Sequence, residues 1–457
     1  HAHGASGLLH VAAGAITAHL DLRLDRDGAW PDPRVSGGPR TRVRVSSFSG
    51  REATVALEAP DKPADVISPV DAPLCRFYGA DSREALAEAV TSDTQGFDGE
   101  TRLALVANSH AGLESLRQHA ASELAANRAP AAPGLEFGEG ELEGEVAFCY
   151  TGAAAAYPGA ARDLLIAFPG IGHNLAERFA GTPKLARDLY GADITSFSPA
   201  TQLTGSSFVC QAHTEFTRNI LGIQPQVALG LSSGETNSLM AFGVWHDLDP
   251  MLADIEASEM YTTQLTGEFR AAAAHWGLPE GEIPSWRCWR ISAPLEEIER
   301  AIADEDHVYV TVVHHYGDVV IGGETAACER VVDALGRKRA MDLGLDMVVH
   351  CEPLAPFADT WRDIHTRETA EVPDVRFYTN ATNQAYIPTR EAAAEAITRQ
   401  ALEPIDLPKT IEQAYEDGVR VFIEHGPRAT LTGAIRHVLE GRPHLVLALD
   451  PHEGAGL

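Results

Sequence analysis

The sequence predicts an α/β protein whose main unit carries an inserted β-α-β-β-α-β subdomain and follows a small α/β module. Three observations predict this class. Strand-like and helical segments alternate along most of the chain. A short apolar run, Val227–Leu229, leads through a Gly/Ser turn into a helical stretch. Between residues 285 and 350 the segments follow the β-α-β-β-α-β order of ferredoxin-like folds.

The composition allows a large buried core and disfavours polyanionic partners. The chain has 457 residues, of which 44% are hydrophobic, and this length is typical of about two to four structural units. Its formal net charge of -29 would repel nucleic acid and anionic membranes, so neither is expected as a partner. No apolar run reaches the roughly 18 residues that a membrane-spanning helix requires.

The cysteine pattern and the start of the chain also constrain the class. The six cysteines are scattered, without C-x-x-C or metal-ligand spacing, which is typical of reduced cysteines in a cytoplasmic protein. The first residues, beginning with His1, lack both a starting methionine and the basic region of a signal peptide. We therefore expect a piece of a longer cytoplasmic chain.

Composition shifts divide the chain into four parts. Residues 1–59 combine a helical stretch over 7–19 with two alternating strands, and residues 60–142 form a small α/β module behind a Pro-rich linker over 61–73. The main unit is expected over residues 143–284 and 351–457, with the inserted subdomain at 285–350. Within that subdomain, strands are expected over Trp286–Ser292, Val308–Val313, Val319–Gly322 and Asp342–Val349, and helices over Leu295–Ala303 and Glu324–Leu335.

The turn after Leu229 has the pattern of a nucleophile elbow. Gly230-Leu231-Ser232-Ser233-Gly234 fits G-x-S-x-G, with a strand before it and a helix after it, as that turn requires. The pattern places the Ser232 hydroxyl at the top of a sheet, and the Ser233 N–H at a helix N-terminus, where a developing oxyanion is stabilised. Ser232 is the candidate nucleophile; the alternative is an ordinary Gly/Ser-rich turn.

A serine hydroxyl is a weak nucleophile and needs a base. Two of the 19 histidines follow a strand-like run and are candidates for this base. His350 ends the run Asp342–Val349 at the return to the main unit, and His425 follows the strand-like run that ends at Glu424. Spacing alone does not decide between them.

Several ordered motifs resemble one family of acyl-transfer enzymes. Gly230–Glu235 resembles G-H-S-x-G-E, and Val349-His350-Cys351 resembles the segment that carries the catalytic histidine. The stretches Tyr150–Gly159 and Phe422–Pro427 resemble the opening and closing signatures. In this order, from about residue 143 to 450, they resemble the malonyl/acyl-CoA:acyl-carrier-protein transacylases of fatty acid and polyketide synthases. The stretches Gly205–His213, Ser232–Asn237, Ala257-Ser258 and Gln264–Gly267 resemble in detail the acyltransferase domains of iterative enediyne and polyunsaturated-fatty-acid synthases.

The resemblance implies an α/β-hydrolase-like core, a mechanism and partners. His350 would take the Ser232 proton as the serine attacks an acyl-CoA thioester, and Gln400 occupies the position of the glutamine whose carbonyl orients that histidine. The main-chain amides of Ser233 and Ala153 would hold the oxyanion. The acyl group would then pass to the phosphopantetheine thiol of an acyl carrier protein. No bound cofactor is implied, and acyl-CoA is a substrate.

The resemblance also implies neighbouring domains. His3–Leu9 and Val45–Gly50 resemble the end of a ketosynthase, so residues 1–59 would be the remnant of that domain and residues 60–142 the module that links it to the acyltransferase.

The sequence departs from the family at positions that select the acyl group. Leu231 replaces the histidine before the serine. The four residues that end at His350, which include Val349, match neither the malonyl nor the methylmalonyl signature of the family. The arginine that binds the malonyl carboxylate in the family is replaced by Ala257, beside an acidic residue. Either another cation, of which Arg270 is the nearest downstream, binds a malonyl carboxylate, or the acyl group is an uncharged starter such as acetyl.

Two further groups of residues are candidates for substrate and partner binding. His314 lies where the family has an Asn-containing loop, and we expect it to line the acyl pocket. It adjoins a second histidine, but two adjacent ligands are too few for a metal site, so no metal is expected. The basic cluster Arg337-Lys338-Arg339 is a candidate docking contact for the carrier protein; otherwise it is a solvated helix end.

Two other functional classes share these features. A serine hydrolase would use the same elbow and histidine, although hydrolases normally add a carboxylate partner where this chain has Gln400. The changes at Leu231 and Ala257 are also compatible with an inactive structural module inside a synthase.

Overall fold

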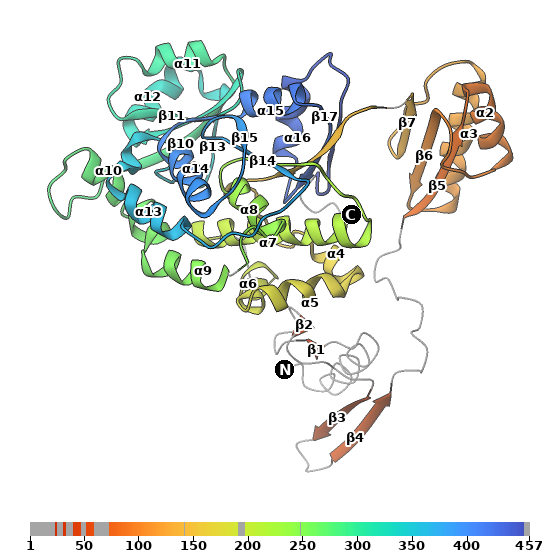
Figure 1. The fold of residues 1–457 in the computed structure, drawn as a ribbon, viewed down its shortest axis with the longest axis horizontal. Helices are drawn as coiled ribbons and strands as arrows, with labels where there is room; N and C mark the ends of the chain where they lie inside the picture. The colour runs from red at the N-terminus through yellow and green to blue at the C-terminus, as the bar shows by residue number, and fades with distance from the viewer. Residues whose placement is uncertain are drawn as a thin grey trace. The chain divides into compact units, whose positions relative to one another are not determined.

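The computed structural model describes residues 73–140, 142–190, 197–246 and 248–451. Nearer the N-terminus it describes four strands in two antiparallel pairs: β1 (Arg23–Leu24) with β2 (Pro31–Asp32), and β3 (Arg40–Ser46) with β4 (Glu52–Glu58). The helix expected over 7–19 and most of the linker expected over 61–73 lie outside the described residues. The chain divides into two compact units, Asp65–Glu143 and the rest (Figure 1).

The smaller unit is an antiparallel sheet with two helices on one face. Strands β5 (Leu74–Ala80), β6 (Thr101–Ala107) and β7 (Leu135–Glu139) pair in that order, and α2 (Arg83–Ser92) and α3 (His110–Ala125) pack against them. Ser82 and Ser109 cap the two helices through their hydroxyls, which satisfies amides that have no partner inside the helix. The buried core includes Tyr78, Leu86, Val90, Leu103, Leu105 and Leu124.

The larger unit is built on a six-stranded sheet in the order β15-β14-β9-β8-β17-β18. All neighbouring pairs are parallel except β14 with β15 at one edge. The strands are β8 (Glu145–Tyr150), β9 (Val227–Gly230), β14 (Arg376–Thr379), β15 (Gln384–Tyr386), β17 (Val419–His425) and β18 (Leu445–Ala448). Strands β8, β9 and β17 are mostly apolar, as is typical of parallel strands buried on both faces.

Helices cover this sheet on both faces (Figure 1). The helical segments of the larger unit outside the inserted subdomain are η2 (Ala153–Ala155), α4 (Arg162–Ala167), α5 (Pro169–Arg178), α6 (Thr182–Tyr190), α7 (Pro199–Thr214), η3 (Glu215–Ile220), α8 (Ser233–Ala241), α9 (Leu248–Ala257), η4 (Met260–Gln264), α10 (Arg270–His275), η6 (Glu352–Phe357), α13 (Ala358–His365), α14 (Arg390–Leu402), α15 (Leu407–Glu416) and α16 (Thr430–Val438).

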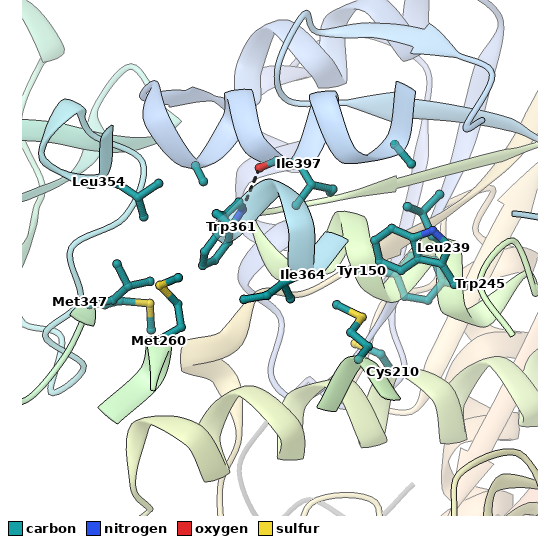
Figure 2. Packing of buried hydrophobic residues seen from close by; sticks show 14 of the residues in the cluster. Tyr150, Cys210, Leu239, Trp245, Met260, Met347, Leu354, Trp361, Ile364 and Ile397 are labelled. Carbon is teal, nitrogen blue, oxygen red and sulfur yellow. Dashed lines mark hydrogen bonds between the residues drawn. The ribbon is translucent and has the colours of Figure 1, made fainter. Parts of the chain in front are cut away.

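Two apolar clusters fill the faces of the sheet. In the first, Trp361 packs with Met260, Met347 and Leu354, and its indole N–H donates to the Ile397 carbonyl (Figure 2). The second cluster lies beneath α15 and α16 and includes Leu229, Leu231, Phe422 and Leu431. Because each cluster contains residues from segments far apart in the chain, the two together fix the sheet in place.

The inserted subdomain has the predicted ferredoxin-like topology. Its antiparallel strands are β10 (Trp286–Ile291), β11 (Val308–His315), β12 (Asp318–Glu324) and β13 (Ala340–Asp342), in the order β13-β10-β12-β11. Helices α11 (Leu295–Ile302) and α12 (Thr325–Leu335) cover one face, and η5 (Arg337–Arg339) precedes β13. A short strand from the larger unit, β16 (Ile405–Asp406), joins the free edge of β11 in parallel.

The prediction of one strand in this subdomain is wrong. Pairing stops at Asp342, so the strand predicted over Asp342–Val349 is replaced by the three-residue β13, which begins earlier. Gly344 has a φ of 66°, and its amide donates to the Asp342 carboxylate, so the chain turns out of the sheet there. Asp346 then accepts from the Cys288 amide, and Val348 donates to the Leu265 carbonyl of the larger unit.

The predicted fold class is confirmed: an α/β core, an inserted ferredoxin-like subdomain and a small α/β module. Within the described residues, every helix is too short or too polar to cross a lipid bilayer.

The core of the smaller unit can be tested at Leu86, which is completely buried. Leu86→Ala should destabilise this unit by about 2–5 kcal/mol, because the lost methyl groups leave a cavity in a close-packed core. Hydrogen exchange read by mass spectrometry should show lost amide protection in β5 and β6. Val106→Ala, at a half-exposed site on β6, is the matched control and should change protection little; equal protection in both variants would contradict the prediction.

Candidate active site

Ser232 lies at a strained turn between β9 and α8. Its φ of 58° and ψ of -123° are unusual for a residue with a side chain, and strain of this kind is concentrated at functional sites. The turn closes because glycines flank it. A Cβ on Gly230 would lie 2.1 Å from the Gly234 carbonyl carbon, and one on Gly234 would lie 2.0 Å from the Tyr150 oxygen. The G-x-S-x-G pattern is therefore required by close approach of main-chain atoms.

Two buried side chains, Glu235 and Asn380, form hydrogen bonds that stabilise the turn. The Glu235 carboxylate accepts hydrogen bonds of 3.1 Å from the Asn380 amide and from the Asn380 side chain. That same side-chain nitrogen donates to the Gly230 carbonyl at 2.6 Å. Burial raises the pKa of Glu235 to about 7. The bonds tie α8 and β14 to the turn and so limit the movement of Ser232.

His350 is brought to Ser232 by two main-chain contacts. Its backbone has a φ of 59°, and its amide donates to the Ala401 carbonyl at 2.7 Å. Its Nδ1 lies 2.6 Å from the Gln400 main-chain oxygen, and its Nε2 lies 2.7 Å from the Ser232 hydroxyl. Since a carbonyl oxygen only accepts, Nδ1 carries the proton, and Nε2 is free to accept from the hydroxyl.

The protonation state of His350 suits a base. Burial lowers its pKa to about 4, although the bond to the Gln400 carbonyl partly opposes this. The imidazole is therefore neutral at pH 7, with its lone pair directed at the serine.

Gln400 contributes through its main chain. The carbonyl that accepts from His350 Nδ1 is the peptide oxygen of Gln400, at the C-terminal end of α14. Its side-chain amide instead donates to the Ser232 carbonyl at 3.3 Å. One residue thus contacts both halves of the pair.

The two candidate oxyanion donors stand at helix starts beside the serine. Ser233 is the first residue of α8 and Ala153 the first of η2, where amides have no partner inside the helix. The loop before η2 is close, since a Cβ on Gly152 would lie 3.6 Å from the Ser232 Cβ. The loop that leads to Ala153 therefore lies beside Ser232.

The rival histidine is enclosed in the core. His425 has both ring nitrogens engaged, Nδ1 with the Ile423 carbonyl and Nε2 with the Thr217 hydroxyl, each at 2.9 Å. Its ring lies 4.1 Å from that of Phe148, and the residue has no exposed surface. Ser232 is thus paired with His350 and not with His425.

The four expected pocket residues occupy different surroundings. Leu231 is buried in the second apolar cluster, and Val349 is half-buried against the first. Ala257 is exposed at the C-terminal end of α9. His314 is 7% exposed, and its Nδ1 has no hydrogen-bond partner among the described residues.

The candidate cations on the surface are mostly paired. Arg270 is exposed and forms an ion pair with Glu268 at 2.7 Å. In the basic cluster, Arg337 pairs with Asp333 at 2.6 Å and Arg339 with Glu297 at 2.8 Å, while Lys338 between them is exposed. The described residues contain no group of three or more His, Cys, Asp or Glu side chains arranged to hold a metal ion.

Sequence reasoning missed residues that hold the pair from a distance. Asn380 and Ala401 contact the site through β14 and α14, elements far from the serine in the chain. No local pattern marks them, because their role depends on where those elements pack. Glu235 alone carried a signal, since it follows the G-x-S-x-G turn directly.

The search against family models returned no match. Three curated relatives align at low identity. A polyunsaturated fatty acid synthase component of Thraustochytrium is 28% identical over 52% of this chain and 12% of its own length. A polyketide synthase of Streptomyces halstedii is 25% identical over 90% of this chain and 6% of its own. The malonyl CoA-acyl carrier protein transacylase of Escherichia coli K12 is 26% identical over 65% of this chain and 93% of its own. The chain thus spans a small part of the first two relatives and almost all of the third.

Solved structures share the fold. The acyltransferase domain of SpnD superposes with a TM-score of 0.64 at 17% identity, covering 86% of this chain and 94% of that one. The acyltransferase domain of an iterative enediyne polyketide synthase gives 0.55 at 18% identity, with 84% and 92% covered. A malonyl-transacylase solved with a type II polyketide acyl-carrier protein gives 0.55 at 24%, with 67% and 96% covered.

The resemblance carried by the motifs is therefore confirmed: the relatives and structural neighbours of this chain include malonyl-CoA:acyl-carrier-protein transacylases, acyltransferase domains of polyketide synthases and a subunit of a polyunsaturated fatty acid synthase.

Proposed function

We propose that this chain is an acyltransferase that moves an acyl group, malonyl in our reading, from coenzyme A to an acyl carrier protein through an acyl-serine. The observation that carries the proposal is the 2.7 Å contact between the Ser232 hydroxyl and His350 Nε2. Relatives named as acyl carrier protein transacylases support it. Ser232 is the nucleophile, His350 the general base and acid, and Gln400 the residue that positions the imidazole.

In the first half-reaction, the Ser232 oxygen attacks the thioester carbon while its proton passes to His350 Nε2. The carbonyl oxygen becomes negative and accepts from the amides of Ser233 and Ala153, each such donor contributing about 3–4 kcal/mol in serine enzymes. As the carbon–sulfur bond breaks, the imidazolium returns the proton to the coenzyme A sulfur. The products are acyl-Ser232 and free coenzyme A.

The second half-reaction reverses these steps with a different thiol. The phosphopantetheine thiol of the carrier protein gives its proton to His350, and its sulfur attacks the acyl-serine carbon. The carbon–oxygen bond breaks, and the proton returns to Ser232. The thioester bond is conserved overall, so the reaction needs no bound cofactor, metal or redox partner.

The orientation of His350 favours transfer over hydrolysis. Serine hydrolases normally place a carboxylate behind the histidine, which stabilises the imidazolium. Here the partner of Nδ1 is the neutral Gln400 carbonyl. Because a carbonyl stabilises the cation less, the base is suited to a reactive thioester and a thiol rather than to water.

We also propose a place for the chain within a larger synthase. Residues 1–59 would be the end of a ketosynthase, and residues 60–142 the module that links it to the acyltransferase. The alignment of 90% of the chain with a polyketide synthase supports this, because it extends beyond the acyltransferase unit. All six cysteines are unpaired, which supports our proposal that the reaction takes place in the cytoplasm.

The covalent intermediate can be measured directly. Incubation with malonyl-CoA should add one malonyl group to the intact mass of the chain, and Ser232→Ala should gain none. His350→Ala should form the adduct roughly 10²–10⁴-fold more slowly, because it lacks the base. Ser258→Ala, outside the site at the end of α9, is the control and should form the adduct normally.

The same experiment separates the alternatives. An adduct with acetyl-CoA but none with malonyl-CoA would replace malonyl by an uncharged starter group. Release of coenzyme A without an adduct would identify a hydrolase, and neither signal would leave an inactive structural module.

The pH dependence of acylation follows from the pKa of His350. Because burial lowers that pKa to about 4, the base is neutral above that pH and becomes protonated as the pH falls through it. The rate of coenzyme A release at low substrate should therefore stay nearly constant from about pH 8 to about 5.5 and decline toward pH 4. Half-maximal activity near about 6.5, the ordinary histidine value, would contradict this environment for the ring.

The docking proposal for the basic cluster rests on Lys338, since the charges of its two neighbours are shared with Asp333 and Glu297. Lys338→Glu should slow transfer to an acidic carrier protein several-fold while self-acylation by acyl-CoA is unchanged, since a rim charge acts mainly on association. Lys184→Glu, an exposed lysine on α6, is the matched control. Equal transfer rates for the two variants would reject the docking role.

A further inference from the structure

The sheet of the ferredoxin-like subdomain has one face that its own helices leave uncovered. Helices α11 and α12 pack on the face that carries Ile291, Val319 and Ile321. Side chains alternate along a strand, so Trp286, Cys288 and Arg290 of β10 lie on the opposite face. Trp286 and Cys288 belong to the first apolar cluster of the larger unit, which shows that this second face is turned toward that unit.

Neighbours of both catalytic residues border this second face. At one end, Trp286 and Cys288 share a cluster with Met347 and Cys351, which flank His350 in the chain. At the other edge, Val312 of β11 packs against the cluster that contains Leu231, the residue before Ser232. In the register, Arg290, Val320 and Val312 form one row across the sheet. Arg290 therefore shares a strand with residues that pack against Met347 and Cys351, and a row with a residue that packs against the cluster of Leu231.

Arg290 is held in place and keeps part of its binding capacity. Its Nε lies 2.8 and 3.0 Å from the two Asp318 oxygens, and Nη2 also contacts this carboxylate. Asp318 thus occupies one edge of the guanidinium, and Nη1 has no acceptor among the described residues. The Arg290 side chain is 32% exposed, whereas that of Asp318 is 10% exposed. A guanidinium has five donors and can bind a second carboxylate at its free end.

His314 adds a second unused group beside this pair. It is 7% exposed, and its Nδ1 has no partner among the described residues, which is costly for a buried polar atom. Burial, and then the nearby Arg290 charge, lower its pKa to about 4, so the ring is neutral and has one N–H to donate. His315, which follows it, is engaged otherwise, stacking on His437 of α16 with ring centres 3.8 Å apart.

The charges of Arg290 and Asp318 balance, so this pair has no net charge of its own. Arg290 is positive and Asp318 is negative, while His315 and His437 lie at the edge toward α16 and are partly or fully exposed. Burial and the proximity of His437 lower the pKa of His315. No further acidic side chain forms an ion pair with Arg290 in the described part of the chain. A substrate carboxylate would thus meet donors from Arg290 and His314 on a face that is partly shielded from water.

We propose that Arg290, positioned by Asp318 and assisted by His314, binds the free carboxylate of a malonyl-type acyl group. This inference rests on the proposed acyl transfer and names its substrate class. The family position for such an arginine is occupied by Ala257, which is exposed at the end of α9, and Arg270 is paired with Glu268. Recognition of the carboxylate thereby moves from the larger unit to the sheet of the inserted subdomain.

The experiment compares self-acylation of the full chain by malonyl-CoA and acetyl-CoA, followed by intact mass. Arg290→Ala should lower the ratio of the malonyl to the acetyl rate roughly 10- to 100-fold, the effect of losing a hydrogen bond to a charged group. Arg287→Ala is the matched control, since it removes an arginine paired with Asp342 from the other face of β10, and the ratio should not change.

The outcomes separate this inference from the proposed function. If neither malonyl-CoA nor acetyl-CoA acylates the wild-type chain, the proposed acyl transfer itself is overturned. If the wild-type chain is acylated and Arg290→Ala has the same ratio of malonyl to acetyl rate, only the carboxylate site is overturned. Should Arg290→Ala fail to fold, Arg290→Gln provides a second test: it keeps a long side chain that can still donate to Asp318 but removes the charge. The malonyl ratio should again fall, and an unchanged ratio there would also reject the site.

Discussion

The contact on which the site depends is the 2.7 Å hydrogen bond between the Ser232 hydroxyl and His350 Nε2. It joins two residues that both have a positive φ, 58° for Ser232 and 59° for His350. Such a conformation costs a residue with a side chain about 1–3 kcal/mol, so the surroundings must hold it there. Those surroundings come from β8, β14 and α14, which are remote in the sequence.

The restraints on the two residues are main-chain contacts in most cases. The glycines at 230 and 234 allow the serine turn to lie against β8 and α8, and the carbonyls of Gln400 and Ala401 hold His350. Main-chain restraints leave the side-chain atoms of Ser232 and His350 free for chemistry. Burial then keeps the imidazole neutral, because the cost of charging it in the interior lowers its pKa.

The inserted subdomain turns one face of its sheet toward the larger unit. Its antiparallel sheet packs on its own helices with one face and contributes Trp286 and Cys288 to the core of the larger unit with the other. Strand β16 joins its edge directly after the helix that carries Gln400, so this sheet and His350 both contact one stretch of chain.

Local patterns in the sequence determined much of this protein. The G-x-S-x-G turn, the alternation of strands and helices, and the β-α-β-β-α-β order depend on neighbouring residues, and the structure follows them. Only the tertiary structure chose His350 over His425, because both follow a strand-like run in the sequence and the structure distinguishes them by what packs around the ring. It also ended β13 at Asp342, where the turn at Gly344 and contacts with Leu265 outweigh the apolar pattern of the following residues. Asn380, Ala401 and Arg290 were likewise unmarked in the sequence, since distant segments must pack together before their polar groups meet anything.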